Sequence, residues 1–357
     1  MNWATRRHSA IALDIGTASV AACQVDRRGD RITLRSWGLA EDALRERPAD
    51  QTAQTDAATS LERAVRLVEQ LGFRGRDIII CMKPPDVSFI PVAAPDAVLN
   101  APRDELLTAL SFQAARELQV DPHSLAVDGW PLPKNRTGAN YLVSAASRAT
   151  VDRRIQALET IGLTVRHIEA IPSVILRAAW RQTQYDEQSL WGALDIGFAG
   201  SVLALAKGPQ CVYVRKLTGG GDAFTLAILD SLEVDYSTAE ILKRQHGAAA
   251  PQADGELPEA INGVLRAGIR ALAREIERAF SYAMESYPEL TPRALHLCGG
   301  AARLEGMCAD LNEELGIEVR LLDACTDLRL RDGVSEPSAL QRPALATGIG
   351  MALGDVL

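Results

Sequence analysis

Two short stretches of the sequence carry residue types that could bind phosphate. Ile11–Val20 reads IALDIGTASV, and Ala193–Val202 reads ALDIGFAGSV, so each has an apolar run that ends in Asp-Ile-Gly. A glycine at a strand turn leaves backbone N–H groups close to whatever lies there, which suits an anion. Two such turns that face each other would hold the β- and γ-phosphates of a nucleotide from both sides.

The two aspartates of these stretches are candidate metal ligands. Asp14 and Asp195 each stand at the end of a predicted strand. Mg²⁺ prefers oxygen ligands and keeps much of its water, so both carboxylates would reach it through bound waters. For either copy alone, an aspartate that caps a strand end is the alternative. The matched placement of both copies favours nucleotide binding.

Glycines outside the two turns extend this pattern. Gly299 and Gly300 follow an apolar strand, which predicts a turn where the backbone can approach an adenosine or its α-phosphate. Gly220 lies in Thr218–Asp222, TGGGD, at the predicted start of a helix. The Gly299-Gly300 turn alone is a weak signal, but as a third element beside the paired turns it supports a nucleotide site.

Glu240 and Lys243 are three residues apart on a predicted helix. They could hold the ribose and base of a nucleotide. From the spacing alone, a solvent-exposed ion pair is favoured. A third interpretation makes Ser237 the N-cap and Glu240 the third helical residue of a capping box.

Composition excludes several classes of protein. The 357 residues favour two lobes, and the net charge of −8 argues against non-specific nucleic-acid binding. No apolar run approaches the length of a membrane span, and Met1–His8 lacks a signal-peptide core. Six cysteines without a CxxC pair indicate a reducing, cytoplasmic compartment. The sequence has no GxxxxGK[ST], no GxGxxG after a strand, no GxSxG, and no histidine pair with ligand spacing.

The elements that must position these residues alternate between strand and helix. Residues 41–59 and 248–257 are predicted as polar loops, helices are predicted over 61–71 and 261–287, and 86–168 is predicted as a compact β-α-β-β-α-β insert. The final stretch, 344–353, is rich in small residues and is predicted as a helix.

The order of motifs resembles the actin/DnaK-type ATPase superfamily, and the PilM family of type IV pilus assembly within it. The resemblance spans residues 9–353, approximately. The closer likeness to the PilM family lies in three segments: FQAARELQVDPHSLAVDGWPL, RHIEAIPSVILRA and RKLTGGGDAFTLAILDSLEVDYSTAEILKRQHG. It implies an α/β, actin-like (ribonuclease H-like) two-lobed fold with an FtsA-type 1C insert. The implied boundaries are 1–85 with 167–190 for subdomain 1A, 86–166 for 1C, 191–340 for lobe 2, and 341–357 for a helix that returns to lobe 1.

The resemblance also implies which residues contact ATP, and its family context favours the nucleotide role for Glu240 and Lys243. The implied contacts are Asp14, Gly16, Thr17, Ala18, Ser19, Asp195, Gly197, Ser201, Gly220, Glu240, Lys243, Gly299, Gly300 and Arg303. Asp14 and Asp195 would bind Mg²⁺, and Glu169 would orient a water for catalysis. Two positions depart from the family pattern: Ala21 replaces a basic residue, and Ala301 replaces a third glycine. These departures lead us to expect nucleotide binding with at most weak hydrolysis.

The implied partner is the cytoplasmic N-terminal tail of a PilN-like inner-membrane protein, held near subdomains 1A and 1C. The protein would then be a nucleotide-sensitive scaffold, cytoplasmic and peripheral at the inner membrane, without nucleic acid, and self-association stays open. Two alternatives belong to the same superfamily. One is a small-molecule kinase, which needs a catalytic aspartate near the phosphates. The other is an FtsA-like division filament protein, which normally ends in an amphipathic membrane helix.

Overall fold

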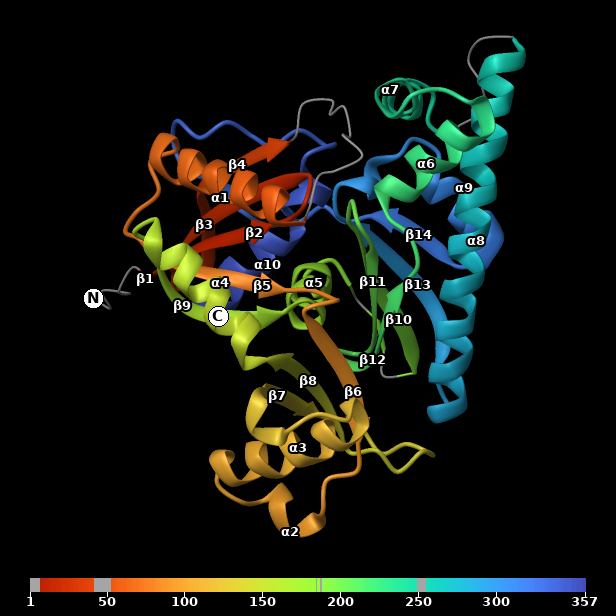
Figure 1. Ribbon diagram of the computed structural model, residues 1–357. Helices are drawn as coiled ribbons and strands as arrows, with labels where there is room; N and C mark the ends of the chain where they lie inside the picture. The colour runs from red at the N-terminus through yellow and green to blue at the C-terminus, as the bar shows by residue number, and fades with distance from the viewer. Residues whose placement is uncertain (1–6, 42–52, 184, 187, 249–254) are drawn as a thin grey trace.

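Three β-sheets and the helices packed on them make up the protein (Figure 1). The computed structural model describes residues 7–41, 53–183, 185–186, 188–248 and 255–357, and side chains are described from residue 60 onward in the first helix. The predictions for Met1–His8 and for the two polar loops therefore lie partly outside the described residues. Within the described residues, no helix combines the length and hydrophobicity needed to cross a membrane.

The first sheet has seven strands in the order β15-β4-β3-β2-β5-β9, with β1 paired to β3. Its strands are β1 (Arg7–His8), β2 (Ile11–Ile15), β3 (Ser19–Arg28), β4 (Arg31–Glu41), β5 (Asp77–Met82), β9 (Thr164–Ala170) and β15 (Arg329–Leu330). Its helices are α1 (Ala53–Gln70), α4 (Arg148–Thr160), α5 (Ile171–Trp180) and α10 (Ala346–Val356). The helix α1 begins inside the segment predicted as a loop, so that prediction was wrong from residue 53 onward.

The second sheet has five strands in the order β12-β11-β10-β13-β14. They are β10 (Ser189–Ile196), β11 (Ser201–Lys207), β12 (Gln210–Leu217), β13 (Thr291–Cys298) and β14 (Glu318–Leu321). The helices α6 (Gly221–Leu232), α7 (Tyr236–His246), α8 (Glu256–Ser286) and α9 (Met307–Leu315) belong to this half. Both large sheets have the same topology. Three consecutive strands pair antiparallel (β2, β3 and β4 in the first sheet; β10, β11 and β12 in the second), and the first of the three also pairs in parallel with a later strand, β5 or β13.

The insert lies between β5 and β9 in sequence. It contains β6 (Val87–Val92), α2 (Asp96–Leu99), α3 (Arg103–Leu118), β7 (Leu125–Pro131) and β8 (Tyr141–Ser147), and its sheet order is β6-β8-β7. Strand β9 was predicted as the last strand of this insert, but it pairs with β5 in the first sheet. Short 3₁₀ helices at Pro122–Ser124, Ala301–Arg303 and Arg342–Leu345 complete the described elements.

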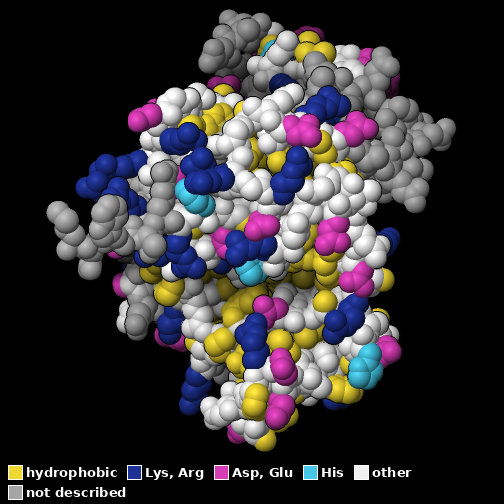
Figure 2. Space-filling view, turned by 90° about the vertical axis from the view of Figure 1, so that its left-hand side faces the viewer, with side chains coloured by type: hydrophobic (Ala, Val, Ile, Leu, Met, Phe, Trp, Pro, Cys, Tyr) yellow, Lys and Arg dark blue, Asp and Glu magenta, His cyan; other side chains and the backbone are white. Residues whose placement is uncertain are grey.

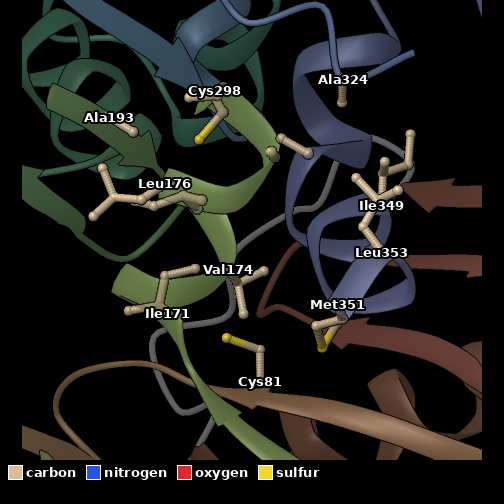
Figure 3. Close-up of a cluster of buried hydrophobic side chains, with 14 of the residues drawn as sticks. Cys81, Ile171, Val174, Leu176, Ala193, Cys298, Ala324, Ile349, Met351 and Leu353 are labelled. Atoms are coloured by element: carbon tan, nitrogen blue, oxygen red, sulfur yellow. The ribbon is translucent and has the colours of Figure 1, made fainter. Parts of the chain in front are cut away.

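The helices α5 and α10 pack against each other in the core between the two large sheets (Figure 3). α10 contacts β2, β3 and β5 of the first sheet, and α5 contacts β10, β11 and β12 of the second sheet as well as β5 and β9 of the first. Small residues allow the close approach: a Cβ added at Gly350 would lie 2.3 Å from the backbone oxygen of Val174. The two large sheets are thus joined through two touching helices.

Replacing Gly350 with alanine is expected to lower the free energy of unfolding by about 2 kcal/mol, because the new methyl group would force the two helices apart. The matched control is Gly263→Ala on α8, where a Cβ would meet nothing within 4 Å. There the gain in helix propensity should stabilise by roughly 0.5–1 kcal/mol. Urea unfolding of both variants measures the difference, and equal stabilisation by both would contradict the close packing.

Candidate functional site

The two Asp-Ile-Gly turns have the same backbone geometry. The Gly16 N–H donates to the Ser19 oxygen at 2.9 Å, and the Gly197 N–H donates to the Gly200 oxygen at 3.0 Å. In both turns, a Cβ added to the glycine would lie 3.0 Å from that accepting oxygen. The first turn joins β2 to β3 and the second joins β10 to β11, so each lobe contributes one copy.

Both turns leave amides available for a ligand. Within the described residues, the N–H groups of Thr17 and Ala18 have no hydrogen-bond acceptor, and neither do those of Phe198 and Ala199. The Ser201 hydroxyl, in contrast, donates to the Gly219 oxygen at 2.9 Å. The predicted phosphate contacts through backbone amides therefore keep their donors, while Ser201 already has a structural partner.

Lys83 joins the two turns. It follows β5 directly, and its Nζ lies 3.2 Å from both carboxylate oxygens of Asp14 and 3.0 Å from Oδ2 of Asp195. The side chains of the two aspartates are 13% and 5% exposed, and that of Lys83 is 27% exposed. One ammonium therefore stands between two shielded carboxylates that come from different lobes.

The charges of this triad influence each other. Burial raises the pKa of Asp14, Lys83 opposes that rise, and the nearby Asp195 adds to it. Burial alone would lower the pKa of Lys83, but Asp14 and Asp195 outweigh it and hold that pKa well above its ordinary value. Lys83 is therefore a permanent cation at neutral pH.

This arrangement does not fit the Mg²⁺ ion predicted at Asp14 and Asp195. An ion held through waters between the two carboxylates would have to displace the Lys83 ammonium or lie close to it, where the two positive charges repel each other. In addition, no group of three or more His, Cys, Asp or Glu side chains is arranged to hold a metal within the described ranges. The Mg²⁺ site stays a prediction, and the position of the Lys83 ammonium between the two carboxylates argues against it.

Gly299 closes the second turn from the side of β13. Its φ is +89°, and a Cβ there would lie 2.5 Å from Oδ1 of Asp195 and 2.5 Å from the Ile196 oxygen. A residue without a side chain is therefore required at this position. The neighbouring Gly300 accepts a hydrogen bond at 2.9 Å from Nε of Arg303, whose guanidinium also pairs with Glu41 of the first lobe.

The start of α6 packs on the second turn. The Gly221 N–H donates to the Gly197 oxygen at 2.8 Å, and a Cβ at Gly220 would lie 2.5 Å from the oxygens of Gly197 and Phe198. Gly220 is thus placed beside the predicted phosphate turn, and its lack of a side chain permits this contact.

Glu240 and Lys243 form a buried ion pair on α7. They are 7% and 9% exposed, which rules out the solvent-exposed pair. Oε2 of Glu240 lies 2.5 Å from Lys243 Nζ and accepts from the Thr225 hydroxyl at 2.6 Å. Lys243 also donates to the Gly221 oxygen at 2.9 Å. The pair therefore anchors α7 to α6, beside the loop that supports the second turn.

The capping-box interpretation of this helix was wrong. Asp235 is the N-cap of α7, and its side chain accepts from the Thr238 N–H at 2.9 Å. Ser237 therefore lies inside the helix, and Glu240 is too far along it to close a capping box.

Glu169, the predicted catalytic residue, is paired with an arginine. Its carboxylate accepts from Arg177 at 2.7 and 3.2 Å, and Arg177 also donates to the Gly350 oxygen at 2.8 Å. The pair links the end of β9 to α5 and α10. Its role with water stays a prediction, because the described contacts tie Glu169 to helix packing.

A groove lies between the first lobe and the insert. Figure 2 shows it as a hollow with hydrophobic side chains. Most of its lining is apolar and comes from β5, β6, β7, β8, α4 and β9: Met82, Val87, Ala126, Val127, Asp128, Ser144, Ala146, Val151, Ile168, Glu169 and Ala170. Met82 immediately precedes Lys83, so the groove and the triad meet at the end of β5.

The insert also contacts the second lobe. The Trp130 indole N–H donates to the Cys211 oxygen at 3.3 Å, and the Gln210 amide donates to the Pro131 oxygen at 2.6 Å. The Arg136 N–H donates to the Ser286 oxygen at 3.0 Å. The insert is therefore attached to both lobes.

Sequence reasoning missed Lys83. The family pattern places a basic residue at position 21, seven residues after Asp14, where this sequence has Ala21. The available signal was the run DIIICM before Lys83, because β5 lies parallel to β2 and parallel strands end at the same edge of a sheet.

Comparison with known proteins gives one family and several related folds. The family model described as "Type IV pilus assembly protein PilM" matches residues 12–356. Among solved structures, a PilM-PilN type IV pilus biogenesis complex is 23% identical with a TM-score of 0.77, covering 98% of this chain and 99% of that one. The ethanolamine utilization protein EutJ from Carboxydothermus hydrogenoformans is 15% identical with a TM-score of 0.54, covering 97% and 89%.

A third structure, MreB 5 of Spiroplasma citri bound to AMPPNP, is 11% identical with a TM-score of 0.51, covering 98% of this chain and 96% of that one. At these identities the structural likenesses show the fold, which is the actin-like one predicted from the sequence. The family match spans nearly all of the sequence. The chain therefore belongs to the PilM family of type IV pilus assembly proteins.

Proposed function

We propose that this protein binds ATP between its lobes and holds the cytoplasmic N-terminal tail of a PilN-like inner-membrane protein, as a nucleotide-sensitive scaffold of type IV pilus assembly. It would lie in the cytoplasm, attached to the inner membrane through that partner. The observation that carries the proposal is the pair of matching turns that meet across Lys83 in a chain of the PilM family. We keep the lobe and insert boundaries given by the resemblance as part of the proposal.

The nucleotide part of the proposal is supported by the donors around the triad. Amides of Thr17, Ala18, Phe198 and Ala199 remain available from both lobes, and they would bind phosphate oxygens. The solved structure of MreB 5 was obtained with AMPPNP, so a related fold accommodates a nucleotide. Glu240, Lys243, Gly299, Gly300 and Arg303 would surround the ribose and base.

The proposal includes at most weak hydrolysis. Phosphoryl transfer to water needs a positioned water and a group that stabilises charge in the transition state. Glu169, the candidate for positioning water, already accepts two hydrogen bonds from Arg177. We therefore assign the nucleotide a structural role.

The partner part of the proposal is supported by the groove. Its apolar walls suit hydrophobic side chains of a short peptide, and a PilM-PilN complex has been solved for a protein with this fold. Met82 lines the groove and Lys83 contacts both turns. A nucleotide that shifts Lys83 would therefore move the wall of the groove, and a difference in affinity between the two states would follow.

Calorimetry with a synthetic tail peptide of the PilN-like protein from the same organism tests the proposal, with and without ATP. Val151→Arg places a charge in the groove and should weaken peptide binding at least about tenfold, because burying an unpaired charge costs free energy. Leu257→Arg is the matched control, since Leu257 is 49% exposed on α8 and is absent from the groove lining.

Three outcomes separate the parts of the proposal. Peptide binding by Val151→Arg at the affinity of the unmodified protein would refute the groove. No heat on addition of ATP would refute the nucleotide site. ATP binding without any change in peptide affinity would leave a scaffold that does not respond to nucleotide.

A further inference from the structure

A half-buried positive charge lies between the two aspartates. Nζ of Lys83 lies 3.2 Å from Asp14 and 3.0 Å from Asp195. The two carboxylates belong to different lobes and would repel each other at this separation if nothing lay between them. The ammonium therefore neutralises both carboxylates, as a bridging divalent cation would.

The parallel pairing of β2 and β5 fixes the position of Lys83 relative to Asp14. Ile11 pairs with Ile78 and Leu13 pairs with Ile80 in parallel register, so β2 and β5 end at the same edge. Lys83 is the first residue after β5, and the three buried residues Ile80, Cys81 and Met82 fix its backbone. The side chain thus reaches Asp14 from the residue directly after a buried strand.

An ammonium carries three N–H donors. Three carboxylate oxygens lie within 3.2 Å of Nζ, so a phosphate oxygen between the turns would take the third donor in place of one oxygen of Asp14. A divalent ion placed beside this ammonium would be repelled by it, whereas a lysine point charge suits phosphate without any metal.

We propose that Lys83 replaces the divalent cation of this site, so that the lobes are held together and nucleotide is bound without Mg²⁺. The nucleotide half of this inference rests on the proposed function, while the metal half does not. Removal of Lys83 would leave two shielded carboxylates with no cation between them. The same change should therefore create a metal site that the unmodified protein lacks.

The test compares the full-length protein with Lys83→Met and Lys83→Arg. In the absence of nucleotide, the Tm of Lys83→Met should fall by roughly 5 °C or more, since an uncompensated buried charge is costly. MgCl₂ should restore at least about half of that loss, while NaCl at equal ionic strength should not. The unmodified protein and Lys83→Arg, which keeps the charge, should show no Tm response to MgCl₂ beyond that to NaCl.

Titration with Mn²⁺, followed by electron paramagnetic resonance, gives a second readout. Lys83→Met should bind one Mn²⁺ that Asp195→Asn in the same background removes. Binding of Mn²⁺ by the unmodified protein that Asp195→Asn abolishes would overturn the proposal, as would a Lys83→Met variant that neither loses stability nor gains a metal.

Nucleotide binding in EDTA completes the test. The affinity of the unmodified protein for ATP should change less than about threefold between MgCl₂ and EDTA, whereas Lys83→Met should lose at least about tenfold in EDTA. An equal dependence on Mg²⁺ in both proteins would overturn the nucleotide half. Absence of ATP binding in every buffer would refute the proposed function and leave the Tm and Mn²⁺ results to decide the metal half.

Discussion

Replacing Gly299 with alanine is expected to destabilise the protein by about 2–4 kcal/mol and to weaken ATP binding at least about tenfold. Two costs add. A side chain at φ +89° strains the backbone, and the new Cβ would lie 2.5 Å from both Oδ1 of Asp195 and the Ile196 oxygen. Asp195 would have to leave Lys83 to make room. Urea unfolding and calorimetry with ATP measure the two effects.

Gly316→Ala is the matched control for this variant. Gly316 has a φ of +64°, and a Cβ there would meet nothing within 4 Å. It therefore carries the backbone cost, about 1 kcal/mol, without the collision. An equal loss of stability in both variants, with ATP binding intact, would show that the contact between Gly299 and Asp195 does not matter.

Acidification is expected to destabilise the protein through His296, a fully buried residue on β13. Burial, assisted by Arg320, lowers the pKa of His296 to about 3, so the folded protein keeps this ring neutral in mild acid. In the unfolded chain the ring takes up a proton below about pH 6.5. The contribution of the neutral His296 ring to the free energy of unfolding is fully present above that pH. It is lost as the pH falls toward 3, at about 1.4 kcal/mol per pH unit.

Comparison of the unmodified protein with His296→Gln isolates this effect. Between pH 7.5 and 5, the unmodified protein should lose about 2 kcal/mol more of its unfolding free energy than the variant does. His123→Gln changes an exposed histidine of the insert and should keep the slope of the unmodified protein. Identical slopes for all three proteins would show that His296 is protonated in the folded state.

The parts of the site that the sequence predicted are those determined by local chemistry. Glycine and small residues directly after a buried strand restrict the chain to a tight turn, so both Asp-Ile-Gly turns could be predicted from about ten residues each. The same holds for the hairpin strands and for α8, whose long apolar periodicity needs a buried face.

The parts that were missed depend on contacts between distant residues. Lys83 is 69 residues from Asp14, and no periodicity brings them together; only the parallel pairing of β2 and β5 does so. Strand β9 reads as an ordinary strand, and its sequence does not say which sheet it joins. For α7, Asp235 and Ser237 are both residue types that cap helices; the structure has Asp235 as the N-cap, and Glu240 accepts a hydrogen bond from Thr225 on α6.

The attachment of the insert to both lobes limits how the protein can move. Hydrogen bonds from Trp130, Gln210 and Arg136 join the insert to the second lobe, and the groove lies between the insert and the first lobe. A rotation that separates the two turns must either break these bonds or carry the insert with the second lobe. In the second case the width of the groove follows the angle between the lobes, and the insert acts as a lever between them.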